Sequence, residues 1–538
     1  MRALVLVAIL GACNAPDHGP RWRAAGGAPR AGGTLHVALN GAIGSLDPTV
    51  AYDDYAFLAL HPLFDTLLDY APGTTDLVPR LAERWEIDPA GTTLRFTLRP
   101  GLRYADGTPI VAADLKYSLE RALTTADSPF GSFLVDIVGA QAVLDGTTRE
   151  CTGLTAPSDH ELVIVLAAPN MAFPYVLAMP FTTPQRADHV RAEGDQLRRR
   201  PLATGPYELA SWDEGQALVL RANPRYDDVT RNRIAELELR EDVPRETQLL
   251  LFEAGELDTV EHLSAPDLLW ISSEAAWQPY LHRRALMNAY GSRLDVRVAP
   301  FSDVRVRQAL NYALDKDHIT KLLTGTSVPA HGILAPGMLG RDETLAPYPH
   351  DPVKARALLA AAGYPDGFDT TYATTDDLEA GNLASSLAAD LADVGVRVHV
   401  QQMSFATYAT ALGRGGTPFG FVSWVGDYPD PSNFLDARFH SRSISPDNSL
   451  NASWYANPVL DALLDHARAE RDPQQRGALY RQAERILYDD APWVWGYHQG
   501  LTEVTQPYVR DYEPHPVWGR DYTRAWLDLD EHGERVSR

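Results

Sequence analysis

Residues 79–123 read PRLAERWEIDPAGTTLRFTLRPGLRYADGTPIVAADLKYSLERAL, and the fold assignment starts from the strand pattern at their centre. There, apolar Leu94, Phe96 and Leu98 alternate with polar Arg95, Thr97 and Arg99. Successive side chains of a strand point to opposite faces, so this alternation predicts a strand with one buried face. The same period of two recurs at residues 34–39, 236–240 and 396–401.

Helices are interleaved with these strands. The pairs Asp351-Pro352, Asn457-Pro458 and Asp472-Pro473 each place a capping side chain before a proline, which is typical of a helix start. Residues 383–394 carry an apolar stripe at helical spacing that ends at Gly395. Because strands and helices mix through the whole length, the sequence predicts an α/β or mixed α+β fold with several sheets.

The size and charge of the chain narrow its class. With 538 residues it is too long for one hydrophobic core and should divide into two or three domains. Its formal net charge of −23 repels phosphate backbones, which argues against nucleic-acid binding. Its 2 cysteines, Cys13 and Cys151, exclude a disulfide framework.

The first residues have the pattern of a secretory signal. Arg2 precedes the apolar run ALVLVAIL at residues 3–10, and the small residues Gly11 and Ala12 follow. The string from Leu10 to Cys13 resembles a bacterial lipobox, so we expect residues 1–13 to be a signal peptide and Cys13 to be lipidated. A plain cleaved signal is the alternative. Residues 14–33, rich in Ala, Gly, Pro and Arg, predict a flexible tether. The expected location is extracytoplasmic, in the periplasm or at the cell surface, with the lipid anchor as the only membrane contact.

Motifs of catalytic and cofactor chemistry are absent from the sequence. It contains no HExxH, CxxC, GxSxG or GxxxxGK[ST]. The 16 histidines are scattered, without a convincing metal-ligand spacing. We therefore expect a protein that is not an enzyme and needs no cofactor or metal.

A series of motifs carries a family resemblance. In chain order they are LDPTVAYDDY (46–55), LFDTLL (63–68), the stretch 79–123, TGPYELASW (204–212), NPRY (223–226), VRVRQALNYALDKDHI (304–319), PVKARALLAAAGYPDGF (352–368), SWVGDYPDPSNFL (423–435) and NPVLDALLDHARAERDPQQRGALYRQAERILYDDAPW (457–493). Together they resemble the oligopeptide- and dipeptide-binding proteins of ABC importers, family 5 of the extracytoplasmic solute-binding proteins. Each motif is weak alone, but their shared order over residues 33–530 is specific.

The resemblance implies a periplasmic-binding-protein fold of class C type, with a two-lobed cleft and an additional smaller lobe. Lobe I would comprise residues 33–67, 197–290 and 499–538, the smaller lobe II residues 68–196, and lobe III residues 291–498. The ligand would lie between lobes I and III, which close by a hinge motion. The implied partners are a peptide ligand, permease subunits and separate ATPases, and we expect a monomer.

The resemblance also implies a ligand site. Peptide binders of this family hold the ligand's α-ammonium with an Asp shortly after a Trp, which corresponds to Asp427 and Trp424 here. The backbone of Ser423, Val425 and Gly426 would bond the peptide as an added strand. The alternative for Asp427 is a local turn bond beside Pro429 and Pro431. Asp430, between those prolines, fits a turn role better.

Other candidates are supported by less. By resemblance, Tyr52, Asp53 and Asp54 face the cleft, with a solvated polar loop as the alternative. Trp495 is expected to line the cleft or to pack where the chain returns to lobe I. Some relatives carry a basic residue three before the Trp, where this chain has Phe421. The partner of the ligand's carboxylate is therefore unassigned, and the nearby basic candidates are Arg414, Arg438, His440 and Arg442.

Two alternatives remain open. The same fold can bind a non-peptide ligand, such as an oligosaccharide, a nickel complex or an opine. A lipoprotein that senses peptides and signals to a membrane partner would also fit the sequence.

Overall fold

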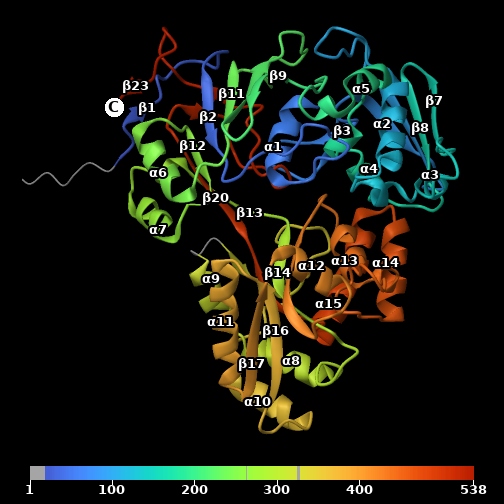
Figure 1. Ribbon diagram of the computed structural model, residues 1–538, viewed down its shortest axis with the longest axis vertical. Helices are drawn as coiled ribbons and strands as arrows, with labels where there is room; N and C mark the ends of the chain where they lie inside the picture. The colour runs from blue at the N-terminus through green and yellow to red at the C-terminus, as the bar shows by residue number, and fades with distance from the viewer. Residues whose placement is uncertain (1–18, 262, 324–326) are drawn as a thin grey trace, which may run out of the picture.

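The computed structural model describes residues 19–261, 263–323 and 327–538 (Figure 1). The predicted signal peptide, Cys13 and the start of the tether lie outside the described residues. Three large sheets organise the chain, in agreement with the predicted mixed fold. We call the bodies built around the seven-, four- and six-stranded sheets lobe I, lobe II and lobe III. The boundaries predicted between the lobes stay predictions, because the sheets fix only which strands share a body.

Lobe I is built on a mixed sheet in the order β13-β20-β12-β2-β11-β10-β9. Its strands are β2 (Thr34–Ala38), β9 (Tyr207–Asp213), β10 (Ala217–Ala222), β11 (Glu236–Arg240), β12 (Thr259–Glu261), β13 (Leu281–Ala285) and β20 (Gly500–Thr505). Its helices are α1 (Asp54–Leu63), α6 (Arg245–Ala254) and α7 (Ala265–Ser273), and α5 (Ala187–Glu193) lies in the segment that precedes β9. β2 and β11 confirm two predicted strands and pair in parallel. Their apolar faces are buried in one core, which includes Leu35, Val37, Leu237 and Leu239.

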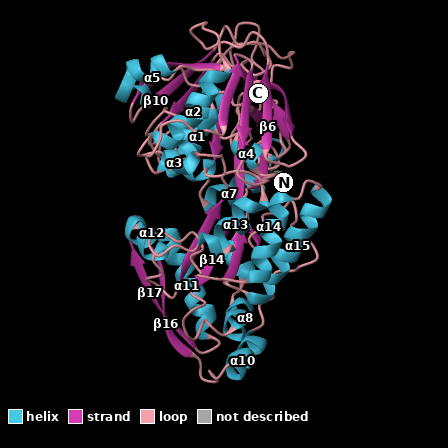
Figure 2. Cartoon of the chain, turned by 90° about the vertical axis from the view of Figure 1, so that its right-hand side faces the viewer, coloured by secondary structure: helices cyan, strands magenta, loops and turns pink. Residues whose placement is uncertain are grey.

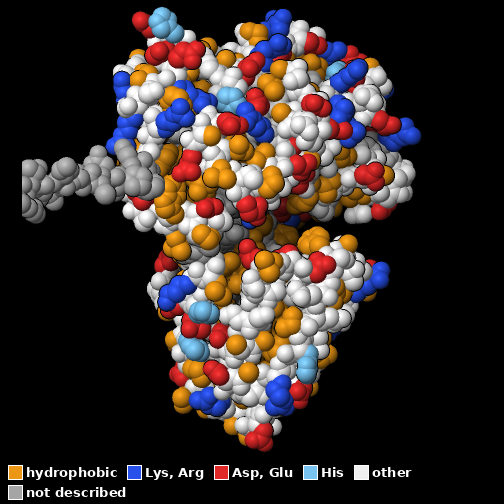
Figure 3. All heavy atoms as spheres, turned by 60° about the vertical axis from the view of Figure 1, so that its left-hand side comes forward, with side chains coloured by type: hydrophobic (Ala, Val, Ile, Leu, Met, Phe, Trp, Pro, Cys, Tyr) orange, Lys and Arg blue, Asp and Glu red, His pale blue; other side chains and the backbone are white. Residues whose placement is uncertain are grey.

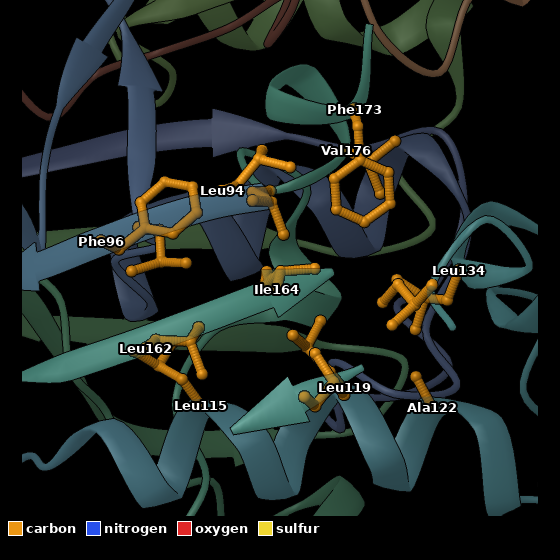
Figure 4. Close-up of a cluster of buried hydrophobic side chains, with 14 of the residues drawn as sticks. Leu94, Phe96, Leu115, Leu119, Ala122, Leu134, Leu162, Ile164, Phe173 and Val176 are labelled. Carbon is orange, nitrogen blue, oxygen red and sulfur yellow. The ribbon is translucent and has the colours of Figure 1, made fainter. Parts of the chain in front are cut away.

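Lobe II is an antiparallel sheet in the order β5-β6-β8-β7, covered by helices. Its strands are β5 (Ala82–Ile87), β6 (Thr93–Leu98), β7 (Leu154–Ser158) and β8 (Glu161–Val165). Its helices are α2 (Ala112–Thr124), α3 (Ala140–Leu144) and α4 (Phe173–Val176). β6 confirms the alternation at residues 94–99, because Leu94, Phe96 and Leu98 are buried. Figure 4 shows Leu94 and Phe96 packed with side chains of β8 and α2 in this core.

Lobe III has the sheet order β15-β19-β14-β18-β16-β17. Its strands are β14 (Asn288–Leu294), β15 (Val328–Pro329), β16 (Phe368–Thr375), β17 (Val396–Met403), β18 (Phe419–Val425) and β19 (Trp493–His498). Its helices are α8 (Val304–Ala313), α9 (Lys316–Leu322), α10 (Pro352–Ala361), α11 (Leu378–Ala392), α12 (Phe405–Gly413), α13 (Pro431–Phe439), α14 (Pro458–Ala469) and α15 (Pro473–Asp490). The predicted caps Asp351, Asn457 and Asp472 each accept a hydrogen bond from the first turn of the helix that follows. Two-stranded pairs complete the chain: β1 (Trp22–Arg23) with β23 (Val536–Ser537), β3 (Leu68–Tyr70) with β4 (Leu77–Pro79), and β21 (Val509–Arg510) with β22 (Trp526–Leu527).

The chain passes between lobes I and III twice, from β13 to β14 and from β19 to β20 (Figure 1). Asn288 fastens the two crossings to each other. Its side-chain oxygen accepts from the Gln499 backbone N–H at 2.7 Å, and its side-chain nitrogen donates to the Gln499 carbonyl at 3.2 Å. These two short crossings are the connections about which the hinge motion expected between lobes I and III would take place.

A buried histidine makes the stability of lobe I dependent on pH. The ring of His61 on α1 lies 3.5 Å from Asp521 and 3.7 Å from Asp69 and stacks on Trp518 at 4.5 Å. Burial alone would lower the pKa of His61, but the two carboxylates outweigh it and raise the pKa to about 9. The protonated ring therefore stabilises the fold below its ordinary pKa of about 6.5 and loses this contribution as pH rises through about 9.

We therefore expect the free energy of unfolding to fall by about 2–3 kcal/mol between pH 6.5 and pH 9.5 because His61 deprotonates. Urea denaturation across this range measures the change. A His61→Gln variant should be less stable at pH 6.5 and should show a shallower decline. Equal slopes for the two proteins would show that His61 does not titrate in this range.

Candidate functional site

The strands of lobe III end at an edge that faces the other two lobes. β18 and β17 both run parallel to β16, so their carboxyl ends lie at the same edge. β16 leads into α11, β17 leads into α12, and β18 leads into Gly426 and Asp427. Figure 2 shows β17 pointing from the far end of lobe III toward lobe I, and Figure 3 shows the surface hollowed at mid-height between the bodies. Ligands of α/β proteins commonly bind at such carboxyl ends.

Asp427 lies at this edge, and within the described part of the chain its carboxylate accepts hydrogen bonds from neutral groups alone. Its Oδ1 accepts from the Tyr52 hydroxyl, and its Oδ2 accepts from Asn433 Nδ2 at 2.9 Å. Its backbone N–H donates to Asn433 Oδ1 at 2.9 Å. Burial raises the pKa of Asp427, and the bonds from Tyr52 and Asn433 lower it in part. Among the described residues no Lys, Arg or His forms an ion pair with this carboxylate.

Tyr52 brings all three lobes together at Asp427. It belongs to the loop before α1 in lobe I, and its ring packs edge-to-face on Phe130 of lobe II at 5.3 Å. Tyr52 is still 43% exposed, so it forms part of an open wall. Burial and the charge of Asp427 raise the pKa of Tyr52 far above its ordinary value. The hydroxyl therefore stays protonated and acts as the hydrogen-bond donor to Asp427.

The two aspartates after Tyr52 have different positions. Asp53 is the N-cap of α1, because its side chain accepts from the Ala56 backbone N–H at 2.8 Å. Asp54 is exposed in the first turn of α1. Burial first, and then the charge of Asp54, raise the pKa of Tyr290 on β14 to about 12. Asp54 of lobe I therefore lies close enough to lobe III to act on its edge electrostatically.

β18 offers an unpaired backbone edge beside Asp427. It pairs with β14 along its whole length, but with β16 only at Gly420. Among the described residues no strand pairs with the other side of residues 423–425, which are Ser423, Trp424 and Val425. Before them, the Phe421 carbonyl accepts from the Tyr408 hydroxyl of α12. Next in the chain, Gly426 donates its N–H to the Met287 carbonyl at 2.8 Å. An extended chain segment could add to β18 at this edge.

The two tryptophans proposed from the sequence lie in different surroundings. Trp424 is half-buried, and its Nε1 donates to Asn433 Oδ1 at 3.2 Å, the atom that also binds the Asp427 backbone. Trp495 is only 1% exposed and packs in the lobe III core with Trp493 and Phe439. In this conformation Trp495 therefore packs inside lobe III and does not line the cleft.

On one side of the hollow, lobes II and III touch. Arg468 at the end of α14 forms an ion pair with Asp136 of lobe II, and its carbonyl accepts from the Met171 backbone N–H at 2.9 Å. Nearby, Arg471 donates to the Asp88 carbonyl at 2.8 Å. These polar contacts hold lobe III against lobe II.

Sequence reasoning missed Asn433, although this residue lies within the quoted motif SWVGDYPDPSNFL. Its side chain connects Asp427 to Trp424 across the first turn of α13.

Sequence reasoning also missed the role of the LDP motif. Both carboxylate oxygens of Asp47 accept from Arg121 of α2, at 2.7 and 2.6 Å, so this motif joins lobe I to lobe II. Only the tertiary structure brings the motif at residues 46–55 to α2.

Residues 76–446 match the family model described as bacterial extracellular solute-binding proteins, family 5 Middle. The Di/tripeptide-binding protein 2 of Pseudomonas aeruginosa (strain UCBPP-PA14) is 28% identical over 524 residues, covering 92% of this chain and 95% of that protein. The Dipeptide-binding protein of Escherichia coli (strain K12) is 27% identical, over 85% of this chain and 87% of its own length. The Heme-binding protein A of Haemophilus influenzae (strain ATCC 51907 / DSM 11121 / KW20 / Rd) is 29% identical, over 84% and 85%.

Solved structures share the fold. The periplasmic binding protein DppA from Helicobacter pylori, in complex with peptide STSA, superposes with a TM-score of 0.77 at 25% identity, covering 93% of this chain and 99% of its own. The clavulanic acid biosynthesis oligopeptide binding protein 2 superposes with a TM-score of 0.86 at 25% identity, over 95% and 99%. In the described part of the chain, no helix is long and apolar enough to cross a bilayer.

Proposed function

This chain belongs to family 5 of the bacterial extracellular solute-binding proteins, and we propose from that premise that it is the peptide-capturing component of an ABC importer. It binds di- to oligopeptides between lobe III and the other two lobes and delivers them to a membrane permease whose ATPases are separate chains. Two curated relatives that align over most of this chain are named for di- or tripeptides, and one structural neighbour holds the peptide STSA.

The observation that carries the proposal is the state of Asp427. Its carboxylate is partly withdrawn from water and is bonded only by neutral donors. A carboxylate has about four lone-pair positions, so two remain for a ligand. A withdrawn charge without a counter-ion attracts a cation strongly, and the α-ammonium of a peptide is a cation with three N–H donors.

The unpaired edge of β18 supports the same ligand. A peptide whose ammonium is held at Asp427 can extend along residues 423–425 and pair its backbone with that edge. Backbone pairing does not depend on side-chain identity, which suits a binder of varied sequences. Relatives named for heme or deoxycholate indicate other ligands of the family. Heme and deoxycholate carry no ammonium group, which is the partner that the Asp427 carboxylate favours.

Membership of the family places the protein outside the cytoplasm, because the family is one of extracellular solute-binding proteins. We further propose that Cys13 is lipidated, that residues 14–33 tether the folded body to the membrane surface, and that the protein acts as a monomer. A protein held near the membrane by a tether can meet its permease repeatedly at high effective concentration.

Calorimetric titration of the purified protein tests the proposed function. A pool of di- to tetrapeptides should bind, and the same pool with acetylated N-termini should bind about 2 kcal/mol or more weaker, because acetylation removes the ammonium. Oligosaccharide and nickel-chelate pools serve as controls and should give no heat. Binding of a control pool in place of the peptides would contradict the proposal.

A further inference from the structure

Arg438, in the last turn of α13, is a buried cation that forms no ion pair with any residue that the structure describes. Its side chain belongs to the buried polar residues, with 6% exposure. Its Nε and Nη2 are buried without a hydrogen-bond acceptor among the described residues. Asp436, the nearest carboxylate in the sequence, is bound by Arg442 instead. Most buried guanidinium groups are paired, so an unpaired one requires an explanation.

Around Arg438 the described residues supply aromatic rings and another N–H donor, but no negatively charged hydrogen-bond acceptor. Its guanidinium carbon lies 5.0 Å from the ring centre of Trp424 and 5.6 Å from that of Trp493. These cation–π contacts are weaker than an ion pair and leave the N–H groups unsatisfied. The Nε1 of Trp493 is also buried, and none of the described residues supplies it with an acceptor. Burial lowers the pKa of Arg438 to about 10, Tyr408 raises it, and the second cation Arg293 lowers it further.

The other basic residues near the site have partners or are solvated. Arg442 pairs with Asp436 and Asp465, each at 3.0 Å. His440 lies between carboxylates of lobe III, 3.4 Å from Asp461 and 3.3 Å from Asp465. Arg414 is exposed to solvent. Arg438 alone among these four is both buried and without an acidic partner in the described part of the chain.

Arg438 is one side chain away from the proposed ammonium site. Trp424 contacts the guanidinium with its ring face, while its Nε1 shares Asn433 Oδ1 with the backbone of Asp427. The Trp424 indole and the Asn433 amide, which donates to Asp427 Oδ2, therefore connect the Arg438 guanidinium to the Asp427 carboxylate, and neither charge has an ion-pair partner among the described residues. A zwitterionic peptide presents the complementary pair of charges.

We propose that Arg438 forms an anion subsite beside Trp424 that receives a carboxylate of the bound peptide. This assignment rests on the proposed function. It adds a residue that recognises the negative charge of the peptide, whereas Asp427 recognises the positive one. A carboxylate accepts two parallel N–H bonds from a guanidinium, which matches the unsatisfied Nε and Nη2. The carboxylate is either the ligand's C-terminus or an acidic side chain.

Four tripeptides, titrated calorimetrically, distinguish these sources. Ala-Ala-Ala is compared with its C-terminal amide, and Ala-Glu-Ala-amide with Ala-Gln-Ala-amide. The wild-type protein should prefer the carboxylate in one of the two comparisons by about 30-fold or more. In Arg438→Met that preference should vanish. In the control Arg442→Met, which alters a cation 43% exposed in its side chain, it should persist.

The melting temperatures of the ligand-free wild-type and Arg438→Met proteins are also compared, because this measurement does not depend on which peptide is chosen. Because Arg438→Met replaces an uncompensated buried charge with an apolar side chain of similar length, it should not lower this temperature. A lower melting temperature together with an unchanged carboxylate preference would overturn the assignment and identify Arg438 as a structural residue. A wild-type protein that binds all four peptides equally would overturn the assignment but leave the proposed function intact. A wild-type protein that binds none of them would contradict the proposed function itself, and the assignment with it.

Discussion

Asp427→Ala is expected to weaken the binding of peptides with a free N-terminus by about 2–5 kcal/mol, because removing one partner leaves the other charge buried and unpaired. Calorimetry on a peptide and its N-acetylated form measures the effect in each protein. The loss should be confined to the free peptide, because the acetylated form has no ammonium to lose. The two forms should therefore bind the variant with similar affinity.

Two variants refine this test. Asp427→Asn keeps the size and the hydrogen-bonding capacity of the side chain but removes its charge, so it should lose nearly as much affinity as Asp427→Ala. Tyr52→Phe removes only the hydroxyl that donates to Asp427 and leaves the charge in place. It should weaken free-peptide binding far less than Asp427→Ala. If Asp427→Ala weakened free and acetylated peptides alike, Asp427 would be a residue that shapes the loop rather than one that holds the ammonium.

Asp430→Ala is expected to lower the free energy of unfolding by about 3–5 kcal/mol, because it leaves Arg476 buried without its partner. The two side chains form a bidentate pair at 2.6 and 2.8 Å and are 1% and 7% exposed. Asp430 also caps α13, accepting from the Ser432 backbone N–H at 3.0 Å. Urea denaturation followed by tryptophan fluorescence measures the change.

Asp465→Ala is the matched control for Asp430→Ala. It also breaks an ion pair with an arginine of lobe III, but the pair with Arg442 is 56% and 43% exposed. We expect a loss below about 1 kcal/mol, because water screens exposed charges and solvates whichever one remains. A loss for Asp430→Ala as small as that for Asp465→Ala would mean that Arg476 finds another partner when Asp430 is removed.

The elements of secondary structure were predictable where local chemistry decides them. The alternation at residues 94–99 became β6, and Asp351, Asn457 and Asp472 cap α10, α14 and α15. Side-chain alternation and capping depend on neighbours within about four residues, which the sequence contains directly. The order of the motifs extended this local information to the family and its fold.

The roles of individual charges were less accessible. Asp53 and Asp54 are adjacent in the sequence, yet one caps α1 and the other is exposed toward the edge of lobe III. Trp495 follows the same apolar strand pattern as Trp493, and whether it faced a cleft or a core depended on α13 packing over β19. Such outcomes depend on which segments meet, and local patterns do not contain that information.

The sequence by itself determined the class of fold, the helix starts, the family and the motif that holds the candidate ammonium site. Only the tertiary structure decided which charge in that motif is compensated. Asp430 meets Arg476, 46 residues further along the chain, whereas Asp427, three residues before it, meets only the neutral Tyr52 and Asn433. Arg442 lies four positions after Arg438, and of the two only Arg442 forms ion pairs with carboxylates of the described residues. The physical reason is that the energy of a buried charge depends on partners brought by distant segments, while its residue type and local spacing stay the same.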